Sequence, residues 1–496
     1  MPTLSRRRLL TAGASALGLA SLARPARAED TAAGPTAPPL PILYEADVVV
    51  VGGGPSGLAA ALAAARAGAS TVLLDREGFF GGVITLCNMG SIAWYRFRDT
   101  VDAGGIHREF ETRAKVMGGT LDMNSGLLAA LTRPKRTRMG LMVDGRPTYE
   151  LLDTEVFKHV ADTLVLEAGV TPLLHCWAAG VEMDGDAVAG VVVESKSGRQ
   201  LLRARRVVDA TGDGDIAWHA GAGFTRAALD DAMEVTTNFS LSGVDLPRFF
   251  AATVRQRGVM SDWAETSGKE DDLFSTHLFA PFEKAKAAGE IPEDFDIRGF
   301  PGGFTREGEV LSINAVHLWK VDPTDVRDVT RAEMEGRSRS MLAIEALRKY
   351  APGFQHARLR SFATALGTRE SRRIAATGTI TEDYVKNQGR CPDSIGVCPE
   401  FLDGYFELYL PITGRYFQVP YGILVPERVD GLLAAGRCTA GDHGSFAATR
   451  QMVCCSLTGQ AAGVAAALSL QHGVQPRALE IGALQAALTG QGVRIA

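Results

Sequence analysis

The chain has few cysteines for its length, and none is arranged to hold a metal or a haem. Only 7 of its 496 residues are cysteine. No two are spaced C-x-x-C, no C-x-x-C-H haem-attachment sequence occurs, and no run of iron–sulfur ligands is present. The spacing of His, Asp and Glu residues suggests no metal site either. The sequence therefore predicts a protein without a metal centre or a haem of its own.

The odd cysteine count also excludes complete internal disulfide pairing. Cys391 and Cys398 are close enough in sequence to close a loop if the chain reaches an oxidising compartment. Cys454 and Cys455 are adjacent, and redox chemistry there competes with the commoner case of buried helix cysteines.

Long apolar runs are absent except at the N-terminus, so we expect no membrane-spanning helix in the body of the chain. The consecutive arginines Arg6, Arg7 and Arg8 precede an apolar stretch over 9–23, and Ala-Arg-Ala follows at 26–28. This layout is typical of an export signal, and the arginines resemble the twin-arginine type. An uncleaved anchor or a chance basic start is the alternative.

Positive charge is scarce as well. The formal net charge is −5, and loss of residues 1–28 removes five arginines and no acid, which leaves −10. So acidic a protein is a poor candidate for binding nucleic acid or an anionic membrane. We predict a twin-arginine signal peptide over 1–28, a flexible linker over 29–44, a periplasmic location and no stable membrane insertion after cleavage.

A glycine-rich turn is the clearest motif present. Gly52-Gly53-Gly54-Pro55-Ser56-Gly57 follows an apolar strand expected over 46–51 and opens a helix expected to end near Ala67. It fits G-x-G-x-x-G, whose glycines permit a tight turn, admit a pyrophosphate and let helix and strand pack closely. Asp75 ends the next strand, where an acid bonds a ribose. The stretch predicts a dinucleotide site, and the acid argues only against NADP.

Three later stretches bear on which dinucleotide binds. "GGVITLCNMG", 81–90, resembles the turn near the isoalloxazine in fumarate reductase and glutathione reductase flavoproteins. "RRVVDATGDGDIAWHAGAGF", 205–224, looks like the flavoprotein ATG motif. The third stretch, 431–470, leads through Gly436 and Arg437 into an alanine-rich helix.

Hairpin signals precede the second of these stretches. The residues before it alternate between apolar and polar, with turns expected at Asp184-Gly185 and Ser197-Gly198. We expect them to form a small β-meander inserted in the nucleotide-binding fold.

Together these blocks resemble the FAD-dependent oxidoreductase family, whose members share "RESRRI", "GDGD" and "AGR … GQAAG" segments. That family is related in fold to succinate dehydrogenase and fumarate reductase flavoproteins. The resemblance covers about residues 45–470 and implies FAD as the cofactor. It implies cofactor contacts from Gly52, Gly54, Pro55, Ser56, Gly57, Asp75, Arg76, Gly82, Ala178, Thr211, Gly212, Gly436, Arg437 and Asp442.

The resemblance also implies an α/β architecture. We expect a Rossmann-like FAD-binding domain with the inserted meander, made of 45–95, 155–225 and 425–496. A mixed α+β substrate or cap domain would comprise 96–154 and 226–424. The sequence of these cap segments contains no motif that predicts a particular substrate.

Two segments are candidates for chemistry near the substrate. In "LGTRESRRIAATG", Arg369 and Arg373 could clamp a substrate carboxylate, or could belong to a solvated charged turn. In "GDHGSFAATRQMVCC", His443 is a candidate base and Arg450 a candidate anion ligand; the alternative is that His443 only bonds its loop and Arg450 pairs with an acid. Tyr416, as a substrate ligand, and His317 are weaker candidates.

The sequence thus predicts a periplasmic enzyme that oxidises a small anionic substrate by hydride transfer to flavin N5. Electrons would pass to an unidentified acceptor, such as a quinone, a cytochrome or oxygen. One alternative is a fumarate reductase-like reductase of an activated double bond, which would need a separate electron donor. The other is a non-catalytic flavin-binding subunit.

Overall fold

The computed structural model describes residues 39–90, 102–121, 142–143, 146–147, 151–252, 261–262, 279–305, 307–404, 407–410 and 415–496. The chain divides into two units, Met1–Leu40 and Pro41–Ala496, and every helix and strand named below belongs to the second. The predicted signal peptide lies outside the described residues. The first strand begins at Ile42, inside the segment predicted as a linker.

The larger sheet forms around a run of buried valines. In spatial order it contains β7 (Thr171–Leu173), β2 (Thr71–Leu74), β1 (Ile42–Val51), β10 (Gly198–Asp209), β9 (Ala187–Ser195) and β8 (Trp177–Asp184), with β22 (Leu432–Ala434) also paired to β10. Strands β7, β2, β1, β10 and β22 pair in parallel. Val48–Val51 of β1 are buried, because a central parallel strand is covered on both faces.

Strand β10 belongs to two kinds of pairing at once. Residues 198–203 pair antiparallel with β9, and residues 207–209 pair in parallel with β1 and β22. The predicted hairpin turns are confirmed, since Gly185 and Gly198 have φ of +59° and +94° between paired antiparallel strands. The meander is therefore a direct extension of the strand that leads into the ATG turn.

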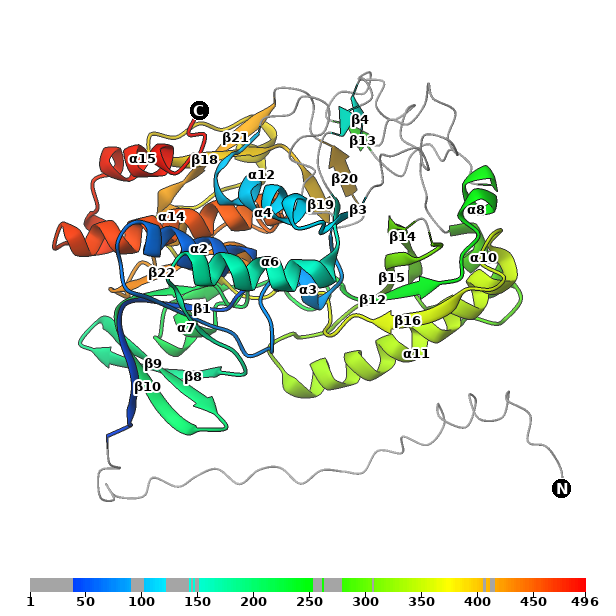
Figure 1. Cartoon of the computed structure of the whole chain (residues 1–496), viewed down its shortest axis with the longest axis horizontal. Helices are drawn as coiled ribbons and strands as arrows, with labels where there is room; N and C mark the ends of the chain where they lie inside the picture. The colour runs from blue at the N-terminus through cyan, green and yellow to red at the C-terminus, as the bar shows by residue number, and fades with distance from the viewer. Residues whose placement is uncertain are drawn as a thin grey trace. The chain divides into compact units, whose positions relative to one another are not determined.

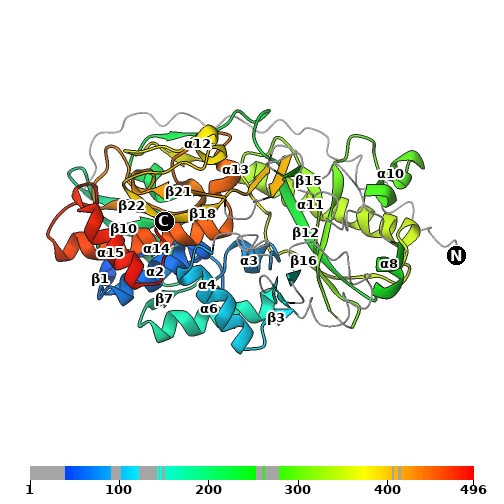
Figure 2. The same cartoon turned by 90° about the horizontal axis from the view of Figure 1, so that it is seen from above.

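Two helices made largely of small residues pack beside this sheet. Helix α2 (Pro55–Arg66) and helix α14 (Met452–Gln471) lie side by side in Figures 1 and 2. A Cβ at Gly459 would lie 2.0 Å from the Ser56 carbonyl oxygen, and one at Gly463 would lie 2.1 Å from that of Ala60. The "GQAAG" segment is thus a close helix–helix contact. By length and composition α14 could cross a membrane, but 89% of its apolar window is buried inside the fold.

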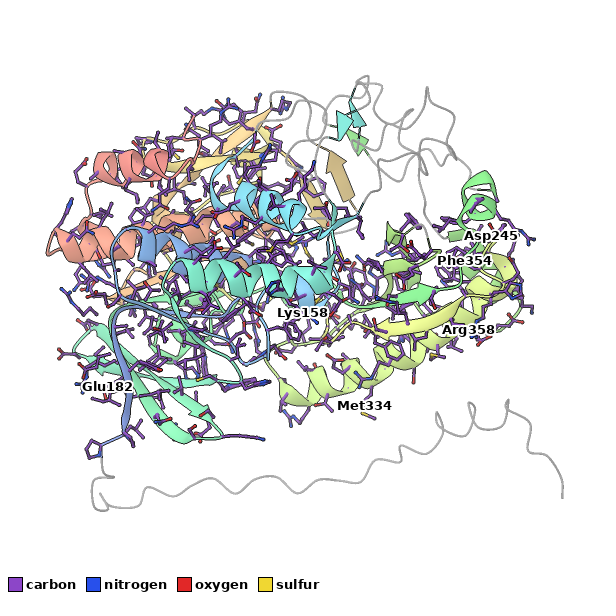
Figure 3. All side chains as sticks on the ribbon, in the orientation of Figure 1. Lys158, Glu182, Asp245, Met334, Phe354 and Arg358 are labelled. Carbon is purple, nitrogen blue, oxygen red and sulfur yellow. The ribbon has the colours of Figure 1, made fainter. Side chains whose placement is uncertain are left out.

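A second, antiparallel sheet forms from residues that the sequence assigns to the cap. Its order is β14 (Ile297–Phe304), β15 (Val310–Leu318), β12 (Val235–Ser242) and β16 (Arg358–Phe362). The long helix α11 (Val326–Tyr350) covers one face (Figure 1). Met334, labelled in Figure 3, is 64% exposed on the outer side of α11, whereas Phe354, also labelled, is buried.

Shorter elements complete the part of the chain that the structure describes. The helices are α3 (Val83–Leu86), α4 (Gly105–Val116), α6 (Thr154–Glu167), α7 (Asp215–His219), α8 (Leu246–Ala252), α10 (Phe279–Ala287), α12 (Glu382–Lys386), α13 (Phe446–Thr449) and α15 (Ile481–Gly490), with 3-10 turns η2 (Tyr421–Leu424), η3 (Gly436–Cys438) and η4 (Pro476–Ala478). The strands are β3 (Thr120–Leu121), β4 (Met142–Val143), β5 (Arg146–Pro147), β6 (Leu151–Leu152), β11 (Phe224–Thr225), β13 (Ser261–Asp262), β17 (Arg373–Ile374), β18 (Ser394–Pro399), β19 (Leu402–Gly404), β20 (Glu407–Leu410) and β21 (Tyr416–Pro420).

The buried apolar residues form two main clusters. One contains β1, α2, α14 and their neighbours, and the other lies entirely within 239–357. Ile374, Ile395 and Phe417, from the stretch predicted as cap, pack in the first cluster. The predicted division into domains stays a prediction, but these three residues share the core of the larger sheet.

Candidate functional site

The glycine turn closes because two of its glycines meet backbone where a side chain cannot fit. Gly52 has φ of +98°, and a Cβ there would lie 2.5 Å from the Ala210 carbonyl oxygen. A Cβ at Gly57 would lie 1.6 Å from the Gly52 carbonyl oxygen. At Gly54 the nearest atom would be the Gly82 Cα, 3.7 Å away. The protein itself thus requires Gly52 and Gly57, whereas Gly54 leaves space beside the turn.

The N-terminus of α2 suits an anion. Gly54 is its N-cap, Pro55 follows at its start, no side chain caps it, and its first turn carries no acid. Unpaired N–H groups and the helix dipole at such an end favour a pyrophosphate. Together with the space at Gly54, these residues fit the diphosphate of a dinucleotide such as FAD.

Asp75 lies directly after β2, as predicted, and holds the glycine turn. Its Oδ2 accepts a hydrogen bond from the Gly53 N–H at 2.6 Å, and its Oδ1 accepts one from the Glu77 N–H at 2.9 Å. Burial raises its pKa in spite of these bonds. The carboxylate keeps further lone pairs with which to bind a ribose, so a role in shaping the turn adds to the predicted one.

Gly82 and its neighbours bring the next predicted cofactor segment against the turn. A Cβ at Gly82 would lie 2.6 Å from the Gly54 Cα, and the Gly81 N–H donates to the Gly53 carbonyl oxygen at 2.8 Å. The predicted contacts Arg76 and Ala178 lie toward β8. The Arg76 guanidinium is 5.2 Å from the ring centre of Trp177, the residue before Ala178.

The ATG turn is organised by a carboxylate that the sequence prediction missed. Asp209, fully buried at the end of β10, accepts hydrogen bonds from the Thr211 N–H, the Thr211 hydroxyl and the Ala217 N–H at 3.1, 2.7 and 2.8 Å. Burial raises its pKa to about 6. Thr211 therefore points its hydroxyl inward, and a cofactor would meet the backbone of Thr211 and Gly212. The signal was available in the Asp that precedes "ATG".

Gly436 and Arg437 join this turn to α2. A Cβ at Gly436 would lie 2.5 Å from the Ser56 Oγ, so two predicted cofactor segments meet there. Arg437 donates from Nη2 to the Asp213 Oδ1 at 2.6 Å and from Nη1 to the Ser371 Oγ at 2.9 Å. Although burial opposes it, the Arg437 charge holds the pKa of Asp213 below its ordinary value.

The predicted substrate arginines are paired with buried acids. Arg369 Nη1 is 2.6 Å from the Glu234 Oε1, and Arg373 Nη1 is 2.5 Å from the Glu370 Oε1. Arg372, which the sequence prediction passed over, donates to the Asp215 Oδ1 at 2.8 Å. The geometry favours positioning roles for these arginines. Binding of a substrate carboxylate by Arg369 or Arg373 remains a prediction.

Glu234 directly precedes β12 and is the centre of a buried charged group beside the sheet β14-β15-β12-β16, which we call the cap sheet. Its Oε1 also lies 3.0 Å from the His317 Nδ1 and 3.7 Å from Arg298. Burial alone would raise the pKa of Glu234, but the bond from His317 and the charge of Arg369 lower it to about 2. Burial lowers the pKa of His317 and so favours its neutral form. His317 therefore belongs to the buried hydrogen-bond network around Glu234.

His443 and Glu370 form a second pair. The His443 side chain is 43% exposed, and its Nδ1 is 3.5 Å from the Oε1 of Glu370, whose Oε2 accepts a hydrogen bond from the Met233 N–H at 3.1 Å. Asp442, predicted to touch the cofactor, accepts from the N–H groups of Glu382 and Ser445 at 3.1 and 2.8 Å. Asp442 thus fixes the loop that carries His443.

Arg450 is held by the strand β19. Its guanidinium bonds the Asp403 carbonyl oxygen and lies 3.1 Å from the Asp403 Oδ2. Its Nε is buried and has no partner in the part of the chain that the structure describes. The Nε of Arg373 is in the same state. Each arginine thus combines one internal ion pair with one unused donor.

Tyr416 lies in a different group of side chains. Its ring is 3.8 Å from the Arg390 guanidinium and 5.6 Å from that of Arg494, and neither arginine belongs to the predicted cofactor set. Its predicted role in substrate binding gains no support from these contacts.

All seven cysteines are free, including Cys391 and Cys398, for which a closed loop was considered. Cys398 instead lies beside Cys454. Within the described ranges, no group of three or more His, Cys, Asp or Glu side chains could hold a metal ion.

Comparison with known proteins identifies relatives for most of the chain. A family model described as FAD dependent oxidoreductase matches residues 47–488. The digeranylgeranylglycerophospholipid reductase 1 of Methanopyrus kandleri is 32% identical over 168 residues, 34% of this chain and 40% of that protein. The thiamine thiazole synthase of Methanothermobacter thermautotrophicus is 29% identical over 173 residues, 34% of this chain and 56% of that protein. These matches span less than two thirds of either relative.

Among solved structures, a match to a geranylgeranyl bacteriochlorophyll reductase-like protein from Thermoplasma acidophilum covers 91% of this chain and 85% of that protein's chain. The two are 14% identical, with a TM-score of 0.44.

Gly54 provides a test of where the diphosphate lies. Because an added Cβ would make only an ordinary contact, at 3.7 Å from the Gly82 Cα, Gly54→Val should leave the thermal stability of the FAD-free protein nearly unchanged. It should weaken FAD binding by about 100-fold, since the diphosphate must approach the backbone there. Fluorescence titration with FAD measures the affinity. Gly490→Val is the control, because a Cβ at Gly490 would have no atom of the described residues within 4 Å. Unchanged FAD affinity in Gly54→Val would place the diphosphate elsewhere.

Proposed function

The chain belongs to the family of FAD-dependent oxidoreductases and is therefore an enzyme whose cofactor is FAD. From this premise we propose that it oxidises a small anionic organic substrate outside the cytoplasm. Bound FAD supplies a two-electron acceptor. The protein's own residues must then bind the substrate, orient it and remove the proton that accompanies oxidation. Electrons leave to a separate acceptor such as a quinone, a cytochrome or oxygen.

The His443–Glu370 pair is the observation that carries this proposal. Glu370 is buried and fixed by Arg373 and by the Met233 N–H, so its Oε1 offers a rigid partner to the His443 Nδ1. A carboxylate in that position orients a histidine ring. Because the ring is 43% exposed, a bound substrate could reach it and pass it a proton.

The unused donors of Arg450 and Arg373 support an anionic substrate. Both guanidinium groups already balance an acid, Asp403 and Glu370 respectively, and both retain a buried Nε–H without a partner among the described residues. A buried donor left without a partner costs free energy, which an oxyanion would recover. Arg373 also lies 5.2 Å from the ring of Phe446, in α13, the helix that ends at Arg450.

Reduction of an activated double bond is the second candidate. Its support is the 32% identity, over 34% of this chain, to a protein named as a reductase. A fumarate reductase-like reaction of this kind needs an electron donor, and the sequence carries no haem-attachment or iron–sulfur pattern that would supply one from this chain. We therefore favour oxidation.

His443 can be tested without knowing the natural substrate. Small hydroxy acids, amino acids and amines would be mixed anaerobically with the enzyme, and bleaching of the visible flavin absorbance would be followed. His443→Ala should slow the bleaching that an active donor causes by about 10²- to 10⁴-fold, the range for loss of a general base, with normal FAD content.

The control is His472→Ala, since that exposed histidine ends α14 and contacts none of the proposed residues. An unchanged rate in His443→Ala would remove this histidine from the reaction. Reoxidation of the reduced enzyme by unsaturated acids, with no donor able to bleach it, would overturn the proposed direction.

Export rests on Arg6, Arg7 and Arg8 before the apolar stretch. Replacement of all three by lysine keeps the charge but removes the guanidinium groups that a twin-arginine pathway reads. In a bacterium with that pathway, the variant should remain in the cytoplasmic fraction while the unaltered chain reaches the periplasm. Arg24→Lys/Arg27→Lys is the control. Equal export of all three proteins would contradict a twin-arginine signal.

A further inference from the structure

The cap sheet has two unlike faces. On one, Phe239 and Leu241 of β12 pack in an apolar cluster with Ile344 and Leu347 of α11. Thr237 points to the same side, because a Cβ at Gly336 of α11 would lie 1.9 Å from its Oγ1. The opposite face carries the intervening residues, since side chains alternate along a strand. These residues are polar on β12, β15 and β16: Asn238, Ser240, Ser312, Asn314 and Ser361.

Two asparagines on the polar face lie opposite each other. Asn238 of β12 and Asn314 of β15 are register partners, which places their side chains within reach of one ligand group. The Asn238 Nδ2 donates to the Cys87 carbonyl oxygen at 2.7 Å. That bond fixes the orientation of the amide, and its buried Oδ1 has no hydrogen-bond partner among the described residues. The Oδ1 of Asn314 is likewise buried and lacks a partner within the described part of the chain.

Such a pair is costly in the free protein. Asn238 is only 2% exposed, so water does not replace the missing bonds of its side chain. A buried acceptor without a donor costs about 1–3 kcal/mol, which a bound hydrogen-bond donor would offset. A site built to bond a hydroxyl also rejects analogues that lack it. Two opposed acceptors therefore indicate recognition of a ligand.

The polar face adjoins the cofactor segment. Besides the bond from Asn238 to Cys87, the Ser312 hydroxyl points to the Met89 sulfur at 3.9 Å. Residues 87–89 directly follow α3, which begins after Gly82, the glycine that touches the turn at Gly54. In Figures 1 and 2, α3 lies next to β12. A ligand on this face would thus lie beside the segment expected near the flavin ring.

We infer that Asn238 and Asn314 recognise a hydroxyl group on the substrate, which makes the substrate a hydroxylated organic acid. The inference deepens the proposed function and rests on it for the anionic group. The neighbouring Ser240 and Ser361 hydroxyls, 2.8 Å apart, extend the same face with neutral groups. Acceptors of this kind select O–H donors, whereas a second carboxylate would be repelled by the amide oxygens.

The test uses two anions of equal chain length, D-gluconate and hexanoate, which differ in their hydroxyl groups. Binding to the FAD-loaded enzyme is followed by the change in the visible flavin spectrum, which requires no turnover. The unaltered enzyme should bind gluconate at least about tenfold more tightly than hexanoate. Asn314→Leu and Asn238→Leu should each lower gluconate affinity about tenfold and leave hexanoate affinity unchanged.

Thr237→Val is the matched control. It removes another buried oxygen of the same strand that lacks a partner in the described part of the chain, on the face toward α11. It should leave the preference for gluconate intact. FAD content and thermal midpoint establish that each variant is folded. Asn314→Leu should melt no lower than the unaltered enzyme, since the Oδ1 that leucine removes has no hydrogen-bond partner among the described residues.

Equal binding of the two anions, no spectral change with either, or an equal loss in Thr237→Val would overturn the inference. So would a fall in the melting midpoint of Asn314→Leu as large as that of Asn238→Leu, which loses the Cys87 bond. The proposed function fails separately. Selective gluconate binding that depends on both asparagines, without flavin bleaching by any hydroxy acid, would contradict oxidation and keep the recognition site.

Discussion

Ion pairs and hydrogen bonds made by five consecutive residues, Arg369–Arg373, connect the parts of the site. Arg369 reaches Glu234 at the start of the cap strand, Glu370 reaches the His443 loop, and Arg372 reaches Asp215 beyond the ATG turn. The Ser371 hydroxyl accepts a hydrogen bond from Arg437, which links the same five residues to the turn at Gly436. Because a lone buried charge is costly, each pair fixes the relative position of two segments that are far apart in sequence. The candidate base, the turns expected to hold the cofactor and the cap sheet are thus all bonded to residues 369–373. We call this set of ion pairs and hydrogen bonds the electrostatic frame.

The segments expected to bind the nucleotide and those proposed to bind the substrate differ in character. The first are shaped by close backbone contacts, and the second contain polar groups without hydrogen-bond partners among the described residues. The turn at Gly52 and Gly57 and the helix contact at Gly459 allow only glycine, so they are complete without a ligand. Asn238 and Asn314, in contrast, retain acceptors with no partner among the described residues. The glycine turn and the helix contact are therefore complete without a ligand, whereas the face proposed to bind a substrate retains unsatisfied acceptors.

Local features could be predicted from the sequence, whereas long-range partners could not. The spacing Gly52–Gly54–Gly57 and the turns at Gly185 and Gly198 reflect backbone conformation within a few residues, and the structure agrees with them. Arg369 and Arg437 pair with Glu234 and Asp213, which lie more than 100 residues away, so these ion pairs could not be predicted from the sequence.

Other contacts also depend on long-range pairing. The antiparallel pair β18–β21 contains Tyr416, whose ring lies beside Arg390 and Arg494, and its role in substrate binding stays a prediction. Asn238 and Asn314 carry no recognisable motif, because only strand pairing brings them together. Their proposed role in binding is inferred from side-chain oxygens that lack partners among the described residues, and it could not be inferred from the residue type.

The most direct measurement of the electrostatic frame is the pH dependence of stability in the unaltered enzyme and in Glu234→Gln. The pKa of Glu234 is about 2 in the fold, below the ordinary 4.5, so its stabilisation is present above pH 4.5 and is lost as pH falls toward 2. The full effect is about 3 kcal/mol. Thermal midpoints of the FAD-loaded proteins should differ near pH 6 and converge toward pH 2.5. A difference that stays constant over this range would contradict an ionised Glu234 at the centre of the frame.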